Sequence, residues 1–151
     1  MALYNALQGN LGLGKAIAYF TSQSIPVAIP LNDTQKYDII ADFNGSLQRI
    51  SIKTSRYKNS NTSYEVLLKN TGGSSGNNKV RLFNNTDCDY VFIYTADEDL
   101  YLIPSKEITA TNTICVGNKY KEYKVYIKSL SDFDKENRKC TLGSNPRLCA
   151  I

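Results

Sequence analysis

Asp38, Ser51 and Lys53 are the residues of this chain whose types and spacing could do chemistry together. They lie on two short hydrophobic runs joined by Asn44-Gly45, a strong signal for a two-residue β-hairpin turn. Side chains alternate along a strand, so Ser51 and Lys53 share one face, and the turn brings Asp38 close to them. A carboxylate, a hydroxyl and a lysine on one sheet surface are suited to metal-dependent cleavage of a phosphodiester.

Each of these side chains has a chemical and a non-chemical interpretation. Hard divalent cations take oxygen ligands, so the Asp38 carboxylate would be the main ligand and the backbone carbonyl of Ile52 a natural second. Lys53 could orient or deprotonate the attacking water, or stabilise the charge that develops on the phosphate. Alternatively, Asp38 caps a turn and Lys53 is an ordinary surface lysine. The spacing alone favours neither interpretation.

The composition excludes several other classes of chemistry. The chain has 151 residues and contains no histidine, which excludes Ser-His-Asp and Cys-His catalysis and zinc sites that use imidazole. The four cysteines follow no metal-binding spacing, so we interpret them as reduced thiols of a cytoplasmic protein. No run reaches the roughly 18 apolar residues of a membrane span, and no signal peptide is recognisable. We expect a single soluble domain over residues 1–151.

The net charge of +4 is unevenly distributed. Basic side chains dominate residues 47–81, the basic block, and acidic side chains dominate residues 87–107, the acidic block. A basic stripe with polar and aromatic neighbours is typical of a nucleic-acid surface, although a solvated face balanced by an acidic one is the simpler alternative. We expect an extended region at about residues 55–83 to contact nucleic acid, and a β-ribbon of this kind fits the major groove of double-stranded DNA. The expected contact residues are Arg49, Arg56, Lys58, Asn59, Asn61, Tyr64, Lys69, Lys79 and Arg81.

Hydrophobic periodicity predicts a helix over residues 3–23, in which three glycines favour a break or a start near residue 12. A short helix is expected from Ser105, and the tail at 129–151 is polar and poorly patterned. The order of elements indicates an α/β fold bordering on α+β, with a mixed β-sheet flanked by helices. The predicted strands are 26–30, 37–43, 47–55, 64–69, 79–83, 89–94 and 100–104.

Five segments of the chain together carry a resemblance to a known family. They are Gly-Lys-Ala-Ile-Ala-Tyr-Phe (14–20), Ile-Pro-Leu-Asn-Asp-Thr-Gln-Lys-Tyr-Asp-Ile-Ile (29–40), Ile-Lys-Thr-Ser-Arg (52–56), Asp-Tyr-Val-Phe-Ile-Tyr (89–94) and Leu-Tyr-Leu-Ile-Pro (100–104). With these segments the chain resembles the PD-(D/E)XK nuclease superfamily, which has the fold of type II restriction enzymes and junction resolvases. More closely, it resembles the cyanobacterial homing endonucleases encoded in group I introns of transfer RNA genes. The resemblance implies a restriction-endonuclease-like core, Mg2+-dependent (or other divalent-cation) cleavage of both DNA strands, a homo-oligomer (dimer or tetramer), and association with the nucleoid when bound to DNA.

Two positions depart from the family pattern. The resemblance places Leu13 where the family usually has a glutamate on its first helix, and Ser51 where it usually has Glu, Asp or Gln. Leucine cannot bind metal or water, and serine brings no charge, so Asp38 would be the only carboxylate of the family set. We therefore keep three interpretations: a site-specific homing endonuclease weakened or inactivated at these positions, a catalytically inactive sequence-specific DNA-binding protein, and a structural or RNA-associated protein of the same fold. The presence of Asp38 and Lys53 on one face argues against the third.

Overall fold

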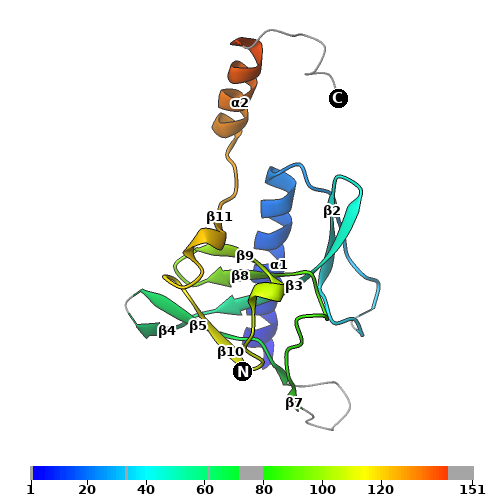
Figure 1. Ribbon diagram of the computed structural model, residues 1–151, viewed down its shortest axis with the longest axis vertical. Helices are drawn as coiled ribbons and strands as arrows, with labels where there is room; N and C mark the ends of the chain where they lie inside the picture. The colour runs from blue at the N-terminus through cyan, green and yellow to red at the C-terminus, as the bar shows by residue number, and fades with distance from the viewer. Residues whose placement is uncertain (1, 33, 61, 72–79, 143–151) are drawn as a thin grey trace.

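The computed structural model describes residues 2–32, 34–60, 62–71 and 80–142. Its main feature is a six-stranded mixed sheet of order β1-β2-β3-β8-β9-β11 (Figure 1). β3 and β8 run parallel, whereas the other neighbours in this sheet are antiparallel. Its strands are β1 (Val27–Ala28), β2 (Ile39–Phe43), β3 (Ser46–Ser55), β8 (Tyr90–Thr95), β9 (Leu100–Pro104) and β11 (Lys124–Val125). The mixed sheet with its flanking helices confirms the predicted fold class.

Two smaller sheets contain the remaining strands. A three-stranded antiparallel sheet has the order β10-β5-β4, and β6 pairs with β7. The strand at Thr113–Val116 was not predicted, and the strand predicted at 26–30 shortens to Val27–Ala28 between its two prolines. These elements are β4 (Tyr57–Ser60), β5 (Ser63–Leu67), β6 (Asn70–Thr71), β7 (Val80–Arg81) and β10 (Thr113–Val116), with short 3-10 helices η1 (Ser105–Glu107) and η2 (Lys121–Tyr123).

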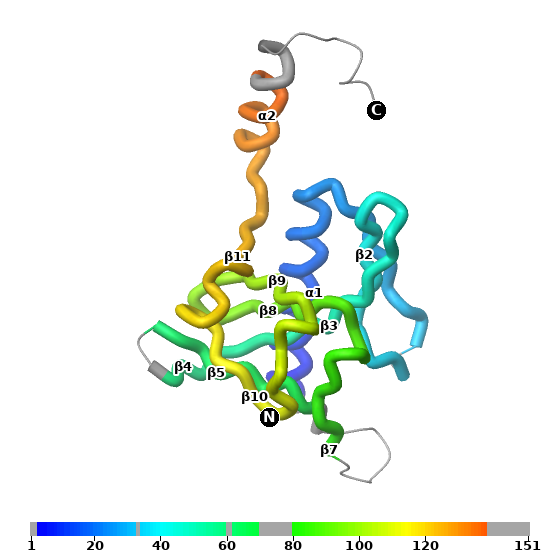
Figure 2. Tube along the Cα trace, in the orientation of Figure 1, coloured from blue at the N-terminus to red at the C-terminus, as the bar shows by residue number. Residues whose placement is uncertain are grey.

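The long helix α1 (Ala2–Ser22) covers one face of the six-stranded sheet (Figures 1 and 2). The predicted break at its glycines is wrong, because the helix is continuous. A Cβ atom at Gly12 would collide with the Thr54 methyl group and crowd that of Ile52, so glycine there lets the helix lie close against β3. Tertiary packing against the sheet thus offsets the low helix propensity of glycine.

Hydrophobic residues on the two faces of the sheet form separate cores. Alternation along β8 directs Phe92 toward α1, while Val91 and Ile93 face the β10-β5-β4 sheet. Phe20 of α1 and Ile50 of β3 are fully buried in the first core. The six-stranded sheet is therefore covered on both faces, and strand β3 separates the two cores.

The β2–β3 hairpin has the turn that the sequence predicted. Asn44 and Gly45 have φ angles of 55° and 89°, the two positive values of a type I′ turn. The Asp42 carboxylate accepts a hydrogen bond from the Gly45 amide at 2.5 Å. The turn fixes the register in which Ile39 pairs with Ile50, and this register sets the residues that meet at the open end of the hairpin.

The C-terminal tail contains a helix that the sequence analysis missed. Helix α2 (Leu130–Leu142) is preceded by Ser129, whose amide and hydroxyl both donate to the Asp132 carboxylate, at 2.9 and 2.8 Å. This pairing is a capping interaction with a recognisable sequence signal. Figure 2 shows α2 extending away from the sheets at one end of the molecule. Among the described residues, no helix is both long and apolar enough to cross a membrane.

The close packing at Gly12 generates a stability prediction. Thr54 cannot easily turn away, because Gln8 holds its hydroxyl at 3.1 Å, so Gly12→Ala should lower the free energy of unfolding by about 1–2 kcal/mol. Gly14→Ala is the matched control on the same helix, where an added Cβ meets nothing within 4 Å. It should raise stability by up to about 1 kcal/mol. Urea unfolding measures both values, and equal effects at the two positions would contradict this account of the packing.

Candidate active site

Asp38 lies directly before β2 and is bonded to β3. Its amide donates to the Ile50 carbonyl at 2.8 Å, which continues the hairpin pairing by one residue. Its carboxylate oxygen Oδ2 accepts the Ile52 amide at 2.5 Å and lies 3.5 Å from the Ser51 hydroxyl. The structure thus brings Asp38 and Ser51 together, as the hairpin signal predicted. The peptide of Ile52 reaches Asp38 through its N–H, and the role of its carbonyl stays a prediction.

Lys53 follows on the same face of β3 and is half-buried. In the parallel register Ser51 pairs with Val91 and Lys53 with Ile93, so both polar residues lie beside apolar core side chains. Burial lowers the pKa of Lys53, and the nearby Asp38 carboxylate opposes this shift without cancelling it. Lys53 therefore loses its proton more readily than a solvated lysine, which suits a group that accepts a proton from water.

A cavity of about 300 Å³ opens beside Asp38. Leu13 of α1 and Asp38 both line it, so the helix position that the family resemblance assigned does face the candidate site. Leu13 also packs against the core under α1, and the two interpretations of this residue are compatible. The remaining lining residues are Ile29, Pro30, Leu31, Asn32, Gln35 and Tyr37.

The potential metal ligands around Asp38 are oxygen atoms, the type of ligand that a hard divalent cation prefers. They are oxygens of one carboxylate, of the Ser51 hydroxyl, and of the Asn32 and Gln35 amides. Within the described part of the chain, no group of three or more His, Cys, Asp or Glu residues could hold a metal ion. Because affinity rises with the charge of the ligands, a site with a single carboxylate should bind such a cation weakly.

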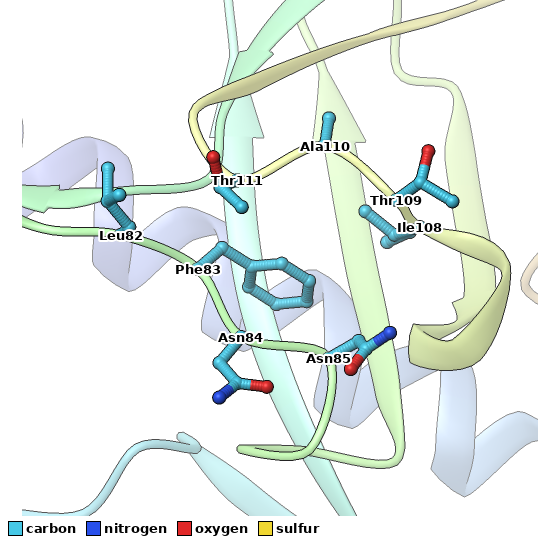
Figure 3. Close-up of a pocket in the computed structure, with 8 residues that line it drawn as sticks. All are labelled: Leu82, Phe83, Asn84, Asn85, Ile108, Thr109, Ala110 and Thr111. Atoms are coloured by element: carbon cyan, nitrogen blue, oxygen red, sulfur yellow. The ribbon is translucent and has the colours of Figure 1, made fainter.

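A second cavity, of about 380 Å³, lies between the segment after β7 and the segment after η1 (Figure 3). The ring of Phe83 lies between the two segments, and among the described residues no ionisable side chain lines the cavity. It contains none of the residues predicted to act in chemistry. Its lining residues are Leu82, Phe83, Asn84, Asn85, Ile108, Thr109, Ala110 and Thr111.

Arg49 forms a bidentate ion pair with Asp89 and does not extend freely into solvent. Its guanidinium donates to both oxygens of Asp89, at 3.1 and 3.0 Å, and its backbone amide donates to the same carboxylate at 2.8 Å. These bonds tie β3 to the residue before β8. Hydrogen bonds from Arg49 hold the pKa of the Asp89 carboxyl below its usual value, although partial burial opposes them.

Two other basic residues of the predicted DNA surface also pair with the acidic block. Lys58 meets Asp97 at 2.8 Å and lies over the ring of Tyr64, which is buried in the core and only 7% exposed. Arg81 meets Asp87 at 2.8 Å, and this carboxylate also accepts Lys36 at 2.7 Å. The sequence did not predict the contact between Lys36 and Asp87, because these residues are far apart in the chain and only the tertiary structure brings them together.

The remaining predicted DNA contacts differ in exposure. Arg56 lies on the surface, with its guanidinium 4.6 Å from the ring centre of Tyr4. Asn59 is exposed and donates to the Cys115 sulfur at 3.3 Å, and Lys69 is half-buried. The predicted contacts Asn61 and Lys79 lie outside the described residues.

The six-stranded mixed sheet with its flanking helices has a restriction-endonuclease-like architecture. A family model described as PD-(D/E)XK endonuclease matches residues 5–135. The chain belongs to this family, which confirms the resemblance seen in the sequence. A search of curated proteins gave no match.

A similar fold is found among solved structures. The bacterial homing endonuclease I-Ssp6803I superposes with a TM-score of 0.67 and 19% sequence identity. The match covers 93% of this chain and 97% of the homing endonuclease. The likeness therefore extends over most of both chains.

The Arg49–Asp89 pair should make stability depend on pH. Since the pKa of Asp89 is lower in the folded state, its contribution is present above the unfolded-state pKa of about 3.9 and is lost as pH falls through the folded-state pKa. Asp89→Asn should lower the free energy of unfolding by about 1 kcal/mol at pH 7, after allowance for partial exposure. The deficit should shrink below about pH 4.

Urea unfolding of both proteins between pH 3 and pH 7 measures this dependence. The exposed Asp134 on α2 offers a control of the same chemistry, and Asp134→Asn should match the parent at every pH. A deficit for Asp89→Asn that stays constant down to pH 3 would show that the carboxylate charge is not what Arg49 recognises.

Proposed function

We propose that this chain is a site-specific endonuclease that hydrolyses phosphodiester bonds of double-stranded DNA with Mg2+ or another divalent cation. The observation that carries this proposal is the Asp38 carboxylate at the mouth of a cavity, with Ser51 and the half-buried Lys53 beside it on β3. Family membership supports phosphodiester hydrolysis. The name of the similar solved protein supports DNA as substrate and a homing role.

Asp38 and its neighbours have distinct roles in the proposed reaction. When bound, the cation polarises the scissile phosphate and lowers the pKa of a water molecule. The Asp38 carboxylate would hold it, oriented by the Ile52 amide, with the Ile52 carbonyl as a second ligand. Lys53 would take the proton of the attacking water at Nζ, because burial makes its neutral form more accessible. Ser51 would accept a hydrogen bond from a bound water.

DNA binding would use exposed basic and polar side chains of β4 and β7. The ion pairs Lys58–Asp97 and Arg81–Asp87 are partly solvent-exposed, and water screens the attraction in such pairs, so each contributes little to stability. A phosphate group can therefore replace the carboxylate at small cost, and such exchanges make affinity fall with salt. The side chains proposed for these contacts are Lys58 and Asn59 of β4, Arg81 of β7, and Arg56, which lies between β3 and β4.

A pair of subunits would place one such site on each DNA strand, which is the reason to propose a homo-oligomer. An enzyme with one site must bind the DNA twice in succession to cut both strands. A two-fold dimer can cut both strands in a single binding event.

A second candidate function is sequence-specific DNA binding without cleavage. The observation that favours it is Leu13, an apolar side chain in the cavity beside the only carboxylate of the family set. Weak cation binding would slow cleavage while leaving the basic strands able to bind DNA.

Restoring the carboxylate on α1 separates these two functions. Leu13→Glu should raise Mg2+-dependent cleavage of a randomised duplex library by about ten-fold or more, because it adds a charged oxygen ligand to the cavity. Sequencing of the new DNA ends measures cleavage and site preference together. Leu11→Glu is the matched control, since Leu11 is 57% exposed on the same helix and does not line the cavity.

Each outcome of this experiment has a defined meaning. Sharp ends from the parent chain support an active nuclease, and sharp ends from Leu13→Glu alone support a disabled one. Retained duplex binding with no cleavage by any variant would select the binding protein. Neither cleavage nor duplex binding would overturn both functions.

The proposed role of Lys53 predicts a pH profile. Single-turnover cleavage of the preferred sequence should rise with pH until it reaches the folded-state pKa of Lys53, which lies below its usual value. Lys53→Met should lower the rate by about 10²–10⁴-fold and flatten this profile. Lys124→Met is the control, because Lys124 pairs with Asp99 at 2.7 Å and lies on the last strand of the sheet. An unchanged pH profile in Lys53→Met would remove Lys53 as the base.

A further inference from the structure

The cavity beside Asp38 has an apolar side and a polar side. Leu13, Pro30 and Leu31 contribute the apolar side. The polar side comes from Asn32 and Gln35, on the segment between β1 and β2. Because this segment ends at Asp38, its amide groups and the carboxylate reach the same space from one short stretch of chain.

Gln35 is oriented by its neighbours. Its Nε2 atom donates to Asn32 Oδ1 at 3.4 Å, and the Thr34 hydroxyl donates to the same oxygen at 3.3 Å. In this arrangement the amide nitrogen of Gln35 is engaged with Asn32. Its carbonyl oxygen Oε1 accepts no hydrogen bond from any residue in the described part of the chain, and the side chain is exposed at the cavity.

Asp38 also keeps one oxygen available. Its Oδ2 atom meets the Ile52 amide and the Ser51 hydroxyl, whereas its Oδ1 atom accepts no hydrogen bond from the residues that the structure describes. Two oxygen acceptors, one charged and one neutral, thus line a single cavity of about 300 Å³. Such a volume holds about ten water molecules, enough for a divalent cation that keeps part of its water shell.

We propose that Gln35, positioned by Asn32, supplies its Oε1 atom to the divalent cation or to a water bound to it, in place of the carboxylate that Leu13 removes. This proposal rests on the proposed metal-dependent function and adds a ligand from a different segment. Neutral amide oxygens are regular ligands of hard cations in proteins. Gln35 would thereby restore a coordinating atom without adding a charge to the site.

Cation binding by the free protein, without DNA, tests the proposal. Mn2+ is the probe, and electron paramagnetic resonance of the unbound ion gives the dissociation constant. Gln35→Ala should weaken Mn2+ binding by about ten-fold, and Gln35→Glu should tighten it by a similar factor. Gln35 is exposed, so both variants should fold, and their thermal unfolding should match that of the parent.

Gln48→Glu is the matched control for charge. Gln48 bonds to Ser46 at the hairpin turn and does not line the Asp38 cavity. If Gln35→Glu and Gln48→Glu change the Mn2+ dissociation constant equally, only long-range charge is acting and the proposal is overturned. Unchanged binding in Gln35→Ala would also overturn it.

Asp38→Asn separates this proposal from the broader function. Weaker Mn2+ binding in Asp38→Asn, with no effect of the Gln35 variants, would retain the metal-dependent nuclease and reject the role of Gln35. No Mn2+ binding by the parent protein at millimolar concentration would reject both.

Discussion

The register of the β2–β3 hairpin is the constraint on which the rest of the site depends. With Ile39 opposite Ile50, the β3 residues Ile50 and Ile52 face α1, and Ser51 and Lys53 face the other core. A shift by one residue would send Lys53 under the helix and separate Asp38 from Ser51. The type I′ turn and the burial of both sheet faces therefore determine which side chains lie next to Asp38, as well as the fold of the hairpin.

The close packing of α1 links the stability of the fold to the composition of the site. Gly12 lets the helix approach Thr54, and the next residue, Leu13, is thereby placed at the wall of the Asp38 cavity. A bulkier residue at position 12 would push α1 away from β3. It would also move Leu13 away from the Asp38 cavity. Neighbouring positions of one helical turn thus determine how closely α1 packs against β3 and which side chain lines the Asp38 cavity.

Local signals made the hairpin, its faces and the cluster of Asp38 with Ser51 predictable. Asn44-Gly45 has only one common turn geometry in a hairpin, and strand alternation then assigns each side chain. The pairing of Lys58 with Asp97 and the burial of Tyr64 were not predictable, since they depend on how distant strands pack. Helix α2 was missed although its capping signal was present, because its polar sequence lacks an apolar stripe.

Leucine at position 13 would affect Lys53 as well as the binding of the proposed cation. Burial is the main cause that lowers the pKa of Lys53, and the Asp38 carboxylate is the main opposing charge. A second carboxylate in the cavity, at position 13, would stabilise the protonated lysine further by Coulomb attraction. Leucine at position 13 supplies no such attraction, so the proposed site has one ligand fewer and a lysine whose neutral form is more accessible. The rate of the proposed cleavage would depend on which of these two effects is larger at the pH of the reaction.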